Sequence, residues 1–89
     1  MTTDFHNVED VYTAGRLVRD ALMEHGEKGA AAELDGTMNT FWTTASEALG
    51  EMSLSFLKVR PAVERATDAS VLRLLDSAVS GATKLFDGA

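Results

Sequence analysis

Apolar residues recur three and four positions apart along most of this chain, and that spacing places them on one face of an α-helix. Alternating runs of β-branched residues between turn signals, which are typical of strands, are nearly absent. The sequence therefore predicts an all-α fold. The stripe is clearest near the C-terminal end, at Leu72, Leu75, Val79, Ala82 and Phe86.

A chain of 89 residues is long enough for one domain. Its 45% hydrophobic and 25% charged residues are the balance of a folded globular protein. We predict a single helical domain over residues 1–89, with residues 1–6 as a flexible N-terminus. The expected architecture is a small antiparallel helical bundle with one or two short helices and three main ones, at about 7–25, 44–60 and 68–86.

Capping residues and helix breakers mark the predicted helix ends. Gly26 is a natural stop for the first helix. Pro61 disfavours helical backbone at the residue before it, so the middle helix is expected to end or kink there. The expected N-terminal caps are Asn7, then Thr44 in a capping box with Glu47, then Thr67 or Asp68.

The middle of the chain is the hardest part to assign. Residues 27–34 predict a short helix that ends at Asp35 and Gly36. Residues 37–44 are threonine-rich and predict a loop or a single turn, and the alternative joins 37–60 into one helix. Gly50 costs about 1 kcal/mol against alanine inside a helix, which suggests a close helix crossing at that position.

Phe41 and Trp42 form the most informative pair of side chains in the sequence. If exposed, they would be a binding hot spot. If buried, their rings would supply area that a small core needs. The sequence favours the core interpretation and leaves the binding interpretation open.

Charge is distributed unevenly along the chain. Residues 1–51 hold ten acidic and three basic residues, and residues 52–89 hold four acidic and five basic ones. Because an acidic protein releases no counterions from a phosphate backbone, nucleic-acid binding is disfavoured. The acidic half suits either solubility or a basic protein partner. We interpret the basic cluster of Lys58, Arg60, Arg65 and Arg73 as solvated charge paired with Glu64, Asp68 and Asp76.

Few residues carry obvious chemistry. His6 and His25 lie at opposite ends of the first predicted helix, about 28 Å apart, so they cannot share a metal within one chain. No serine lies in a G-x-S-x-G motif, and the sequence has no phosphate-binding glycine loop. We therefore expect no catalytic residue, no cofactor and no metal site.

The absence of cysteine fits a reducing cytoplasm, where we expect the protein to act. The first residues have neither a basic nor an apolar region, so we expect no signal peptide. The longest apolar run has three residues, so no membrane span is expected.

The function expected from these observations is that of a non-catalytic interaction or regulatory module, such as a small bacterial regulator or adaptor. One alternative is an acidic antitoxin, immunity or inhibitor protein that neutralises a basic partner. Another is an enzyme subunit whose site lies between chains.

Self-association is the expected partnership. The apolar stripe of residues 68–86 is wider than two other helices of one short chain need to cover. We therefore predict a homodimer, with a second protein partner possible on the acidic half, residues 1–51. The interface candidates are Leu72, Leu75, Val79, Ala82, Phe86, Phe41 and Trp42.

Overall fold

The computed structural model describes residues 5–88, and within that range four α-helices follow one another with no strand between them. They are α1 (Val8–Glu24), α2 (Lys28–Met38), α3 (Ala45–Ala66) and α4 (Ala69–Gly88). The predicted all-α bundle, with three long helices and one shorter helix, is confirmed.

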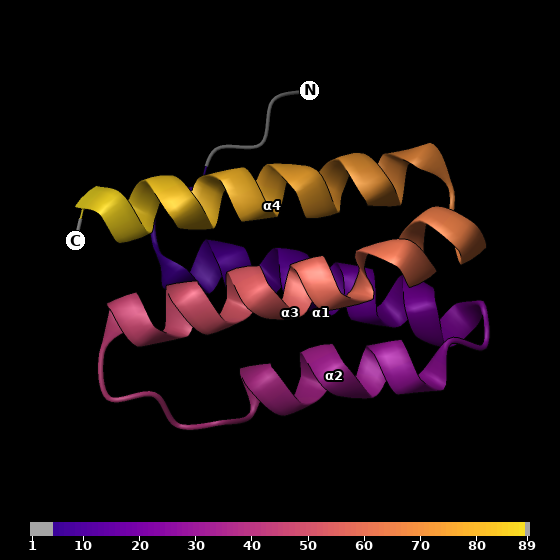
Figure 1. The fold of residues 1–89 in the computed structure, drawn as a ribbon, viewed down its shortest axis with the longest axis horizontal. Coiled ribbons are helices and arrows are strands. Elements are labelled where there is room, and N and C mark those ends of the chain that lie inside the picture. The colour runs from indigo at the N-terminus through magenta and orange to yellow at the C-terminus, as the bar shows by residue number, and fades with distance from the viewer. Residues whose placement is uncertain (1–4, 89) are drawn as a thin grey trace.

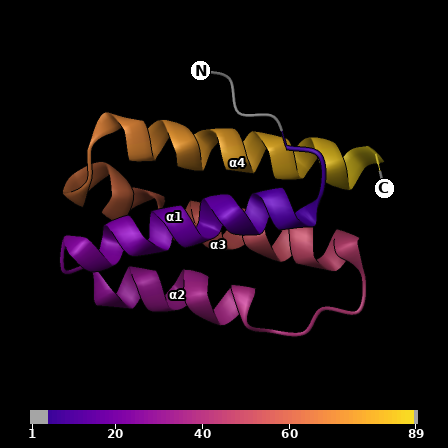
Figure 2. The same ribbon diagram turned by 180° about the vertical axis from the view of Figure 1, so that it is seen from behind.

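Each helix runs antiparallel to the next, and α1 and α3 lie between α2 and α4 (Figures 1 and 2). The two central helices contact each other and both outer helices, whereas no described residue of α2 contacts α4. The molecule is flat, with extents of 35 × 29 × 16 Å. One broad face is formed by the outer side of α3, in front in Figure 1, and the other by α1, in front in Figure 2.

The first two predicted caps are present. The side-chain oxygen of Asn7 accepts a hydrogen bond from the Asp10 amide at 3.0 Å, and Thr44 Oγ1 accepts one from the Glu47 amide at 3.1 Å. In a capping box the Glu47 carboxylate would also accept a hydrogen bond from the Thr44 backbone amide. Here the carboxylate accepts one from the Thr44 hydroxyl instead, at 3.4 Å. Gly26 has a φ of 77°, so its left-handed backbone ends α1 where a side chain would be strained.

Of the two candidate caps for the last helix, Asp68 is the one used. Its Oδ1 accepts from the amides of Ser70 at 3.0 Å and Val71 at 3.2 Å. Thr67 instead ends α3, where its hydroxyl donates to the Val63 carbonyl at 2.6 Å. Two adjacent residues thus separate α3 from α4 with a very short connection.

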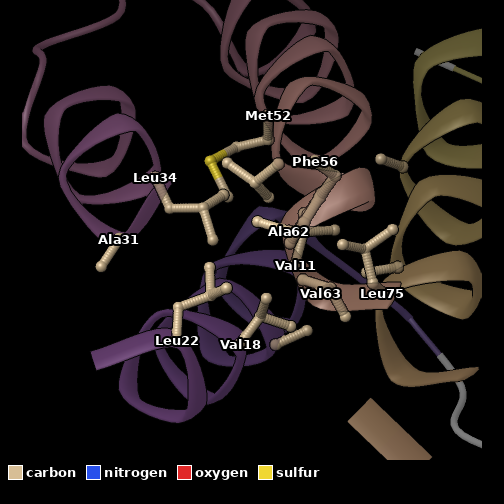
Figure 3. Packing of buried hydrophobic residues seen from close by; sticks show 14 of the residues in the cluster. Val11, Val18, Leu22, Ala31, Leu34, Met52, Phe56, Ala62, Val63 and Leu75 are labelled. Carbon is tan, nitrogen blue, oxygen red and sulfur yellow. The ribbon is translucent and has the colours of Figure 1, made fainter. Parts of the chain in front are cut away.

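The core lies where the inner faces of the helices meet, as Figure 3 shows for the buried side chains of all four elements. Buried positions on α1 and α3 repeat at three and four residues, which is the spacing read from the sequence. The largest fully buried side chains are Phe56, Leu22, Leu34, Met52, Leu75, Val11, Val18 and Val63.

The predicted close crossing at Gly50 is wrong, and the tight contact is at Gly15 instead. A Cβ at Gly50 would meet only the Phe86 ring, at an ordinary 3.7 Å. A Cβ at Gly15 would lie 2.8 Å from both Met38 Sδ and Met52 Cε. Glycine at position 15 therefore lets the two methionines pass between α1, α2 and α3.

The N-terminal segment, expected to be flexible over residues 1–6, is described only from Phe5 onward, and residues 1–4 lie outside the described range. Phe5 is partly buried and packs against the core. Its ring occupies the space that a side chain at Gly81 would need, since a Cβ there would lie 2.5 Å from Phe5 Cδ2. The chain is thus held to α4 before α1 begins.

The expected end of the second helix at Asp35 and Gly36 is wrong, because α2 continues to Met38. Tertiary contacts stabilise the extra turn. Asp35 receives a hydrogen bond from Arg19 of α1 at 2.8 Å, and the Thr37 carbonyl accepts one from the Trp42 indole at 3.0 Å. The alternative of one helix over 37–60 is also excluded, since residues 39–44 are not helical.

The third helix was expected to end or kink before Pro61, and an end at residue 60 is wrong. Helix α3 continues through Pro61 to Ala66, and Figure 1 shows its last turns directed toward the start of α4. Pro61 is exposed, whereas Val63 beyond it is fully buried. Burial of the last turn offsets the free-energy cost of the backbone hydrogen bond that is lost because proline has no amide proton.

Candidate interaction surfaces

Most of the α4 residues predicted to form an interface pack instead in the core of the same chain. Leu75 and Ala82 are fully buried, and Leu72 and Val79 are partly buried and pack against the core. The fourth helix needed a wide stripe because it covers both α1 and α3. Of the α4 candidates, Phe86 is the large side chain that remains exposed, at 48%.

Phe41 and Trp42 lie in the connection between α2 and α3 but have different environments. Phe41 is 89% exposed, so the favoured core interpretation is wrong for this residue. Trp42 is partly buried, and its indole N–H donates to the Thr37 carbonyl at the end of α2. The two adjacent rings could not both reach the core from an extended loop.

The loop that carries Phe41 is fixed on both sides. Before it, Thr40 donates to the Gly36 carbonyl at 2.8 Å. After it, the hydroxyls of Thr43 and Thr44 both donate to the Glu47 carboxylate. The Phe41 side chain is therefore exposed to solvent on a loop that hydrogen bonds stabilise on both sides.

The outer face of α3 carries an apolar surface that the sequence analysis did not identify. Leu54 is 54% exposed and Leu57 is 52% exposed, although both lie in the middle of the longest helix. Beside them, Phe86 lies over Gly50, and a shallow depression is lined by Gly50, Ser53, Thr83 and Phe86.

A signal for this surface was present in the sequence. Gly50, Leu54, Leu57 and Pro61 are spaced four, three and four residues apart, which forms a second stripe on the same helix. The longer stripe of buried residues through Met52 dominates the apolar pattern of this helix and hides the second one.

The acidic half of the sequence is not an uninterrupted acidic surface. Basic residues of α3 reach back to α2, where Lys58 Nζ lies 3.4 Å from Glu33 and Arg65 lies 2.9 Å from Glu27. Glu51, by contrast, has no base of the described chain within ion-pairing distance.

Arg60 is the member of the basic cluster that pairs as expected. Lys58 and Arg65 pair with acidic residues of the α2 region, and Arg73 makes no ion pair within the described residues. Arg60 contacts both carboxylate oxygens of Asp76, at 2.9 and 3.0 Å, and Glu64 at 3.3 Å. The hydrogen bonds from Arg60 lower the pKa of Asp76. Asp68, the third expected partner, caps α4 instead, and the Ser70 hydroxyl is the main cause of its lowered pKa.

Within residues 5–88, histidine and carboxylate side chains do not gather in a group of three that could hold a metal ion. No described helix is long and apolar enough to cross a membrane. Comparison of the chain with protein-family models, with curated proteins and with solved structures finds no match.

Proposed function

We propose that this protein is a non-catalytic interaction module that inserts Phe41 into an apolar pocket on a partner protein. The observation that carries the proposal is the 89% exposure of Phe41 on a loop braced at both ends. An exposed phenylalanine gains nothing for the fold. A preorganised aromatic side chain, however, loses little conformational entropy on binding and is a common anchor of interfaces.

Charge around the loop indicates the chemistry of the partner. Residues 29–57 contain four acidic residues and no lysine, arginine or histidine. Glu33 and Asp35 are paired with bases from other helices, whereas Glu47 and Glu51 make no ion pair within the described chain. We expect the partner's pocket to have a basic rim, so that binding is weakened by salt.

The proposal is tested by placing a photo-crosslinking phenylalanine analogue at position 41 in cells that make the protein. A matched control carries the analogue at Ser77, which is exposed on α4. One protein crosslinked from position 41 and not from position 77 is the expected result. Equal crosslinking from both positions would contradict it.

A second measurement uses the purified partner. Phe41→Ala should weaken binding by about thirtyfold or more, the loss expected for a hot-spot aromatic, and leave the thermal unfolding midpoint unchanged. If the variant binds as tightly as the wild type, Phe41 is not the anchor. If the bound protein covers a basic active surface of its partner, it belongs to the class of acidic inhibitors.

A further inference from the structure

The exposed stripe on the outer face of α3 lies on a surface different from that of Phe41. Leu54 and Leu57 lie three residues apart and face away from the buried Met52 and Phe56. Together with the exposed Pro61 they form an apolar strip on the outer side of α3, the helix that lies in front of α1 in Figure 1.

We infer that a second copy of this chain covers this face, with the two α3 helices packed antiparallel across a two-fold axis. The spacing of Gly50, Leu54, Leu57 and Pro61 is the four-three-four repeat of a two-helix contact. In an antiparallel pair, Leu54 of each copy faces Leu57 of the other. Gly50 then faces Pro61, a small residue opposite a bulky ring.

Gly50 itself supports a helix approaching from outside. Within the chain, an alanine at this position would meet only the Phe86 ring at ordinary contact distance. The helix therefore keeps a destabilising glycine that its own packing does not require. The shallow depression between Gly50 and Phe86 has room for a side chain of the second copy.

Charge on the flank of the strip favours the antiparallel orientation. Glu51 and Lys58 lie one heptad apart on the same side of α3. Antiparallel pairing places Glu51 of each copy beside Lys58 of the other, so that the attraction is made twice. Lys58 can reach across, because its side chain is 68% exposed even though it contacts Glu33.

The ends of the strip limit the contact. Glu47 lies three residues before Gly50, and Glu64 lies three residues after Pro61. In the antiparallel pair, the carboxylate of Glu47 in one copy would face that of Glu64 in the other, and the two like charges would repel each other. The interface therefore spans Gly50 to Pro61 and includes Phe86. The two Phe41 loops, which precede α3, lie at opposite ends of such a dimer.

The first test is the mass in solution by light scattering, at low and at about 0.5 M salt, from micromolar to millimolar protein. The expected wild-type mass is twice the 9.5 kDa of one chain. A wild type that stays a monomer throughout this range would overturn the proposal.

The surface is tested with a matched pair of double variants. Leu54→Glu with Leu57→Glu should raise the dimer Kd by about a hundredfold or more and keep the helical circular dichroism of the wild type. Leu17→Glu with Met23→Glu changes residues of α1 that are 54% and 51% exposed, and it should leave the dimer intact. A dimer that survives the α3 variant, or that is lost equally in the α1 variant, contradicts the assignment.

The orientation is tested by a charge exchange. Glu51→Lys or Lys58→Glu alone sets like charges opposite each other and should weaken the dimer several-fold. Both changes together should restore it. If the double variant is as weak as the singles combined, the antiparallel register is wrong. None of these readouts depends on Phe41, so the failure of one proposal leaves the other standing.

Discussion

Phe5 lies against α4 because Gly81 has no side chain. A Cβ at Gly81 would lie 2.5 to 2.8 Å from three atoms of Phe5, including its own Cβ. The whole residue, and not only the tip of the ring, would have to move to make room.

This contact predicts coupling between the two positions. Alanine in place of Gly81 should gain about 1 kcal/mol of helix propensity when Phe5 is replaced by glycine, which removes both the ring and the Cβ that would lie 2.8 Å away. With Phe5 present, the displaced ring should cancel most of that gain. Urea unfolding of the two single variants and the double variant measures the coupling, expected near 1 kcal/mol. Simple additivity would show that Phe5 does not pack on Gly81 in solution.

Two other glycines should respond differently to alanine. Gly50→Ala should stabilise the protein by up to about 1 kcal/mol, because the new methyl group meets only the Phe86 ring at 3.7 Å. Gly15→Ala should gain less, because the ends of the Met38 and Met52 side chains, both 2.8 Å from the new Cβ, must first shift to make room for it. Urea unfolding compares the two variants, and an equal or larger gain at Gly15 would contradict the packing.

The buried hydroxyl of Ser55 predicts an asymmetric pair of substitutions. The Thr37 hydroxyl donates to the Glu33 carbonyl, so the hydrogen bond between Thr37 and Ser55, at 2.5 Å, uses the proton of Ser55. Thr37→Val leaves that buried donor without its partner and should cost about 1 to 3 kcal/mol. Ser55→Ala should cost less, and the double variant should resemble Ser55→Ala. Chemical denaturation of all three checks the order.

Pro61 should be replaceable with a gain in stability. The helix passes through it, and its ring faces solvent. Pro61→Ala restores an amide donor within α3 and should raise the free energy of unfolding by about 1 to 3 kcal/mol. Thermal unfolding measures this. A loss of stability would contradict the expectation that α3 gains from an amide donor at this position.

Two aspartates should contribute to the acid limb of the stability curve. The pKa of Asp68 is lowered chiefly by the Ser70 hydroxyl, and that of Asp76 chiefly by Arg60. Unfolded aspartate titrates near pH 4. Because both folded pKa values lie lower, the stabilisation is fully present above about pH 4 and is lost as the pH falls through them.

Asp76→Asn should therefore flatten the fall in the free energy of unfolding below about pH 4. Asp68→Asn should do the same while keeping a residue that can cap α4. Urea unfolding from about pH 6 to about pH 2 measures the slopes. Ser77→Ala, also exposed on α4, should keep the wild-type slope. An unchanged slope in both aspartate variants would contradict the hydrogen bonds.

The local signals in the sequence determined where most helices begin and which faces they bury. The caps at Asn7 and Thr44 and the stop at Gly26 act between neighbouring residues, so they could be read without a structure. The three-four spacing identified the core because the period of a helix is a local property.

Tertiary structure decided the positions where contacts from distant residues compete with a local preference. Gly36 and Pro61 both favour a helix end, yet contacts made by Asp35 and the burial of Val63 extend the two helices past them. The same reason explains the surfaces. Whether Phe41, Leu75 or Leu54 is exposed depends on which helices lie nearby, and one helix alone does not contain that information.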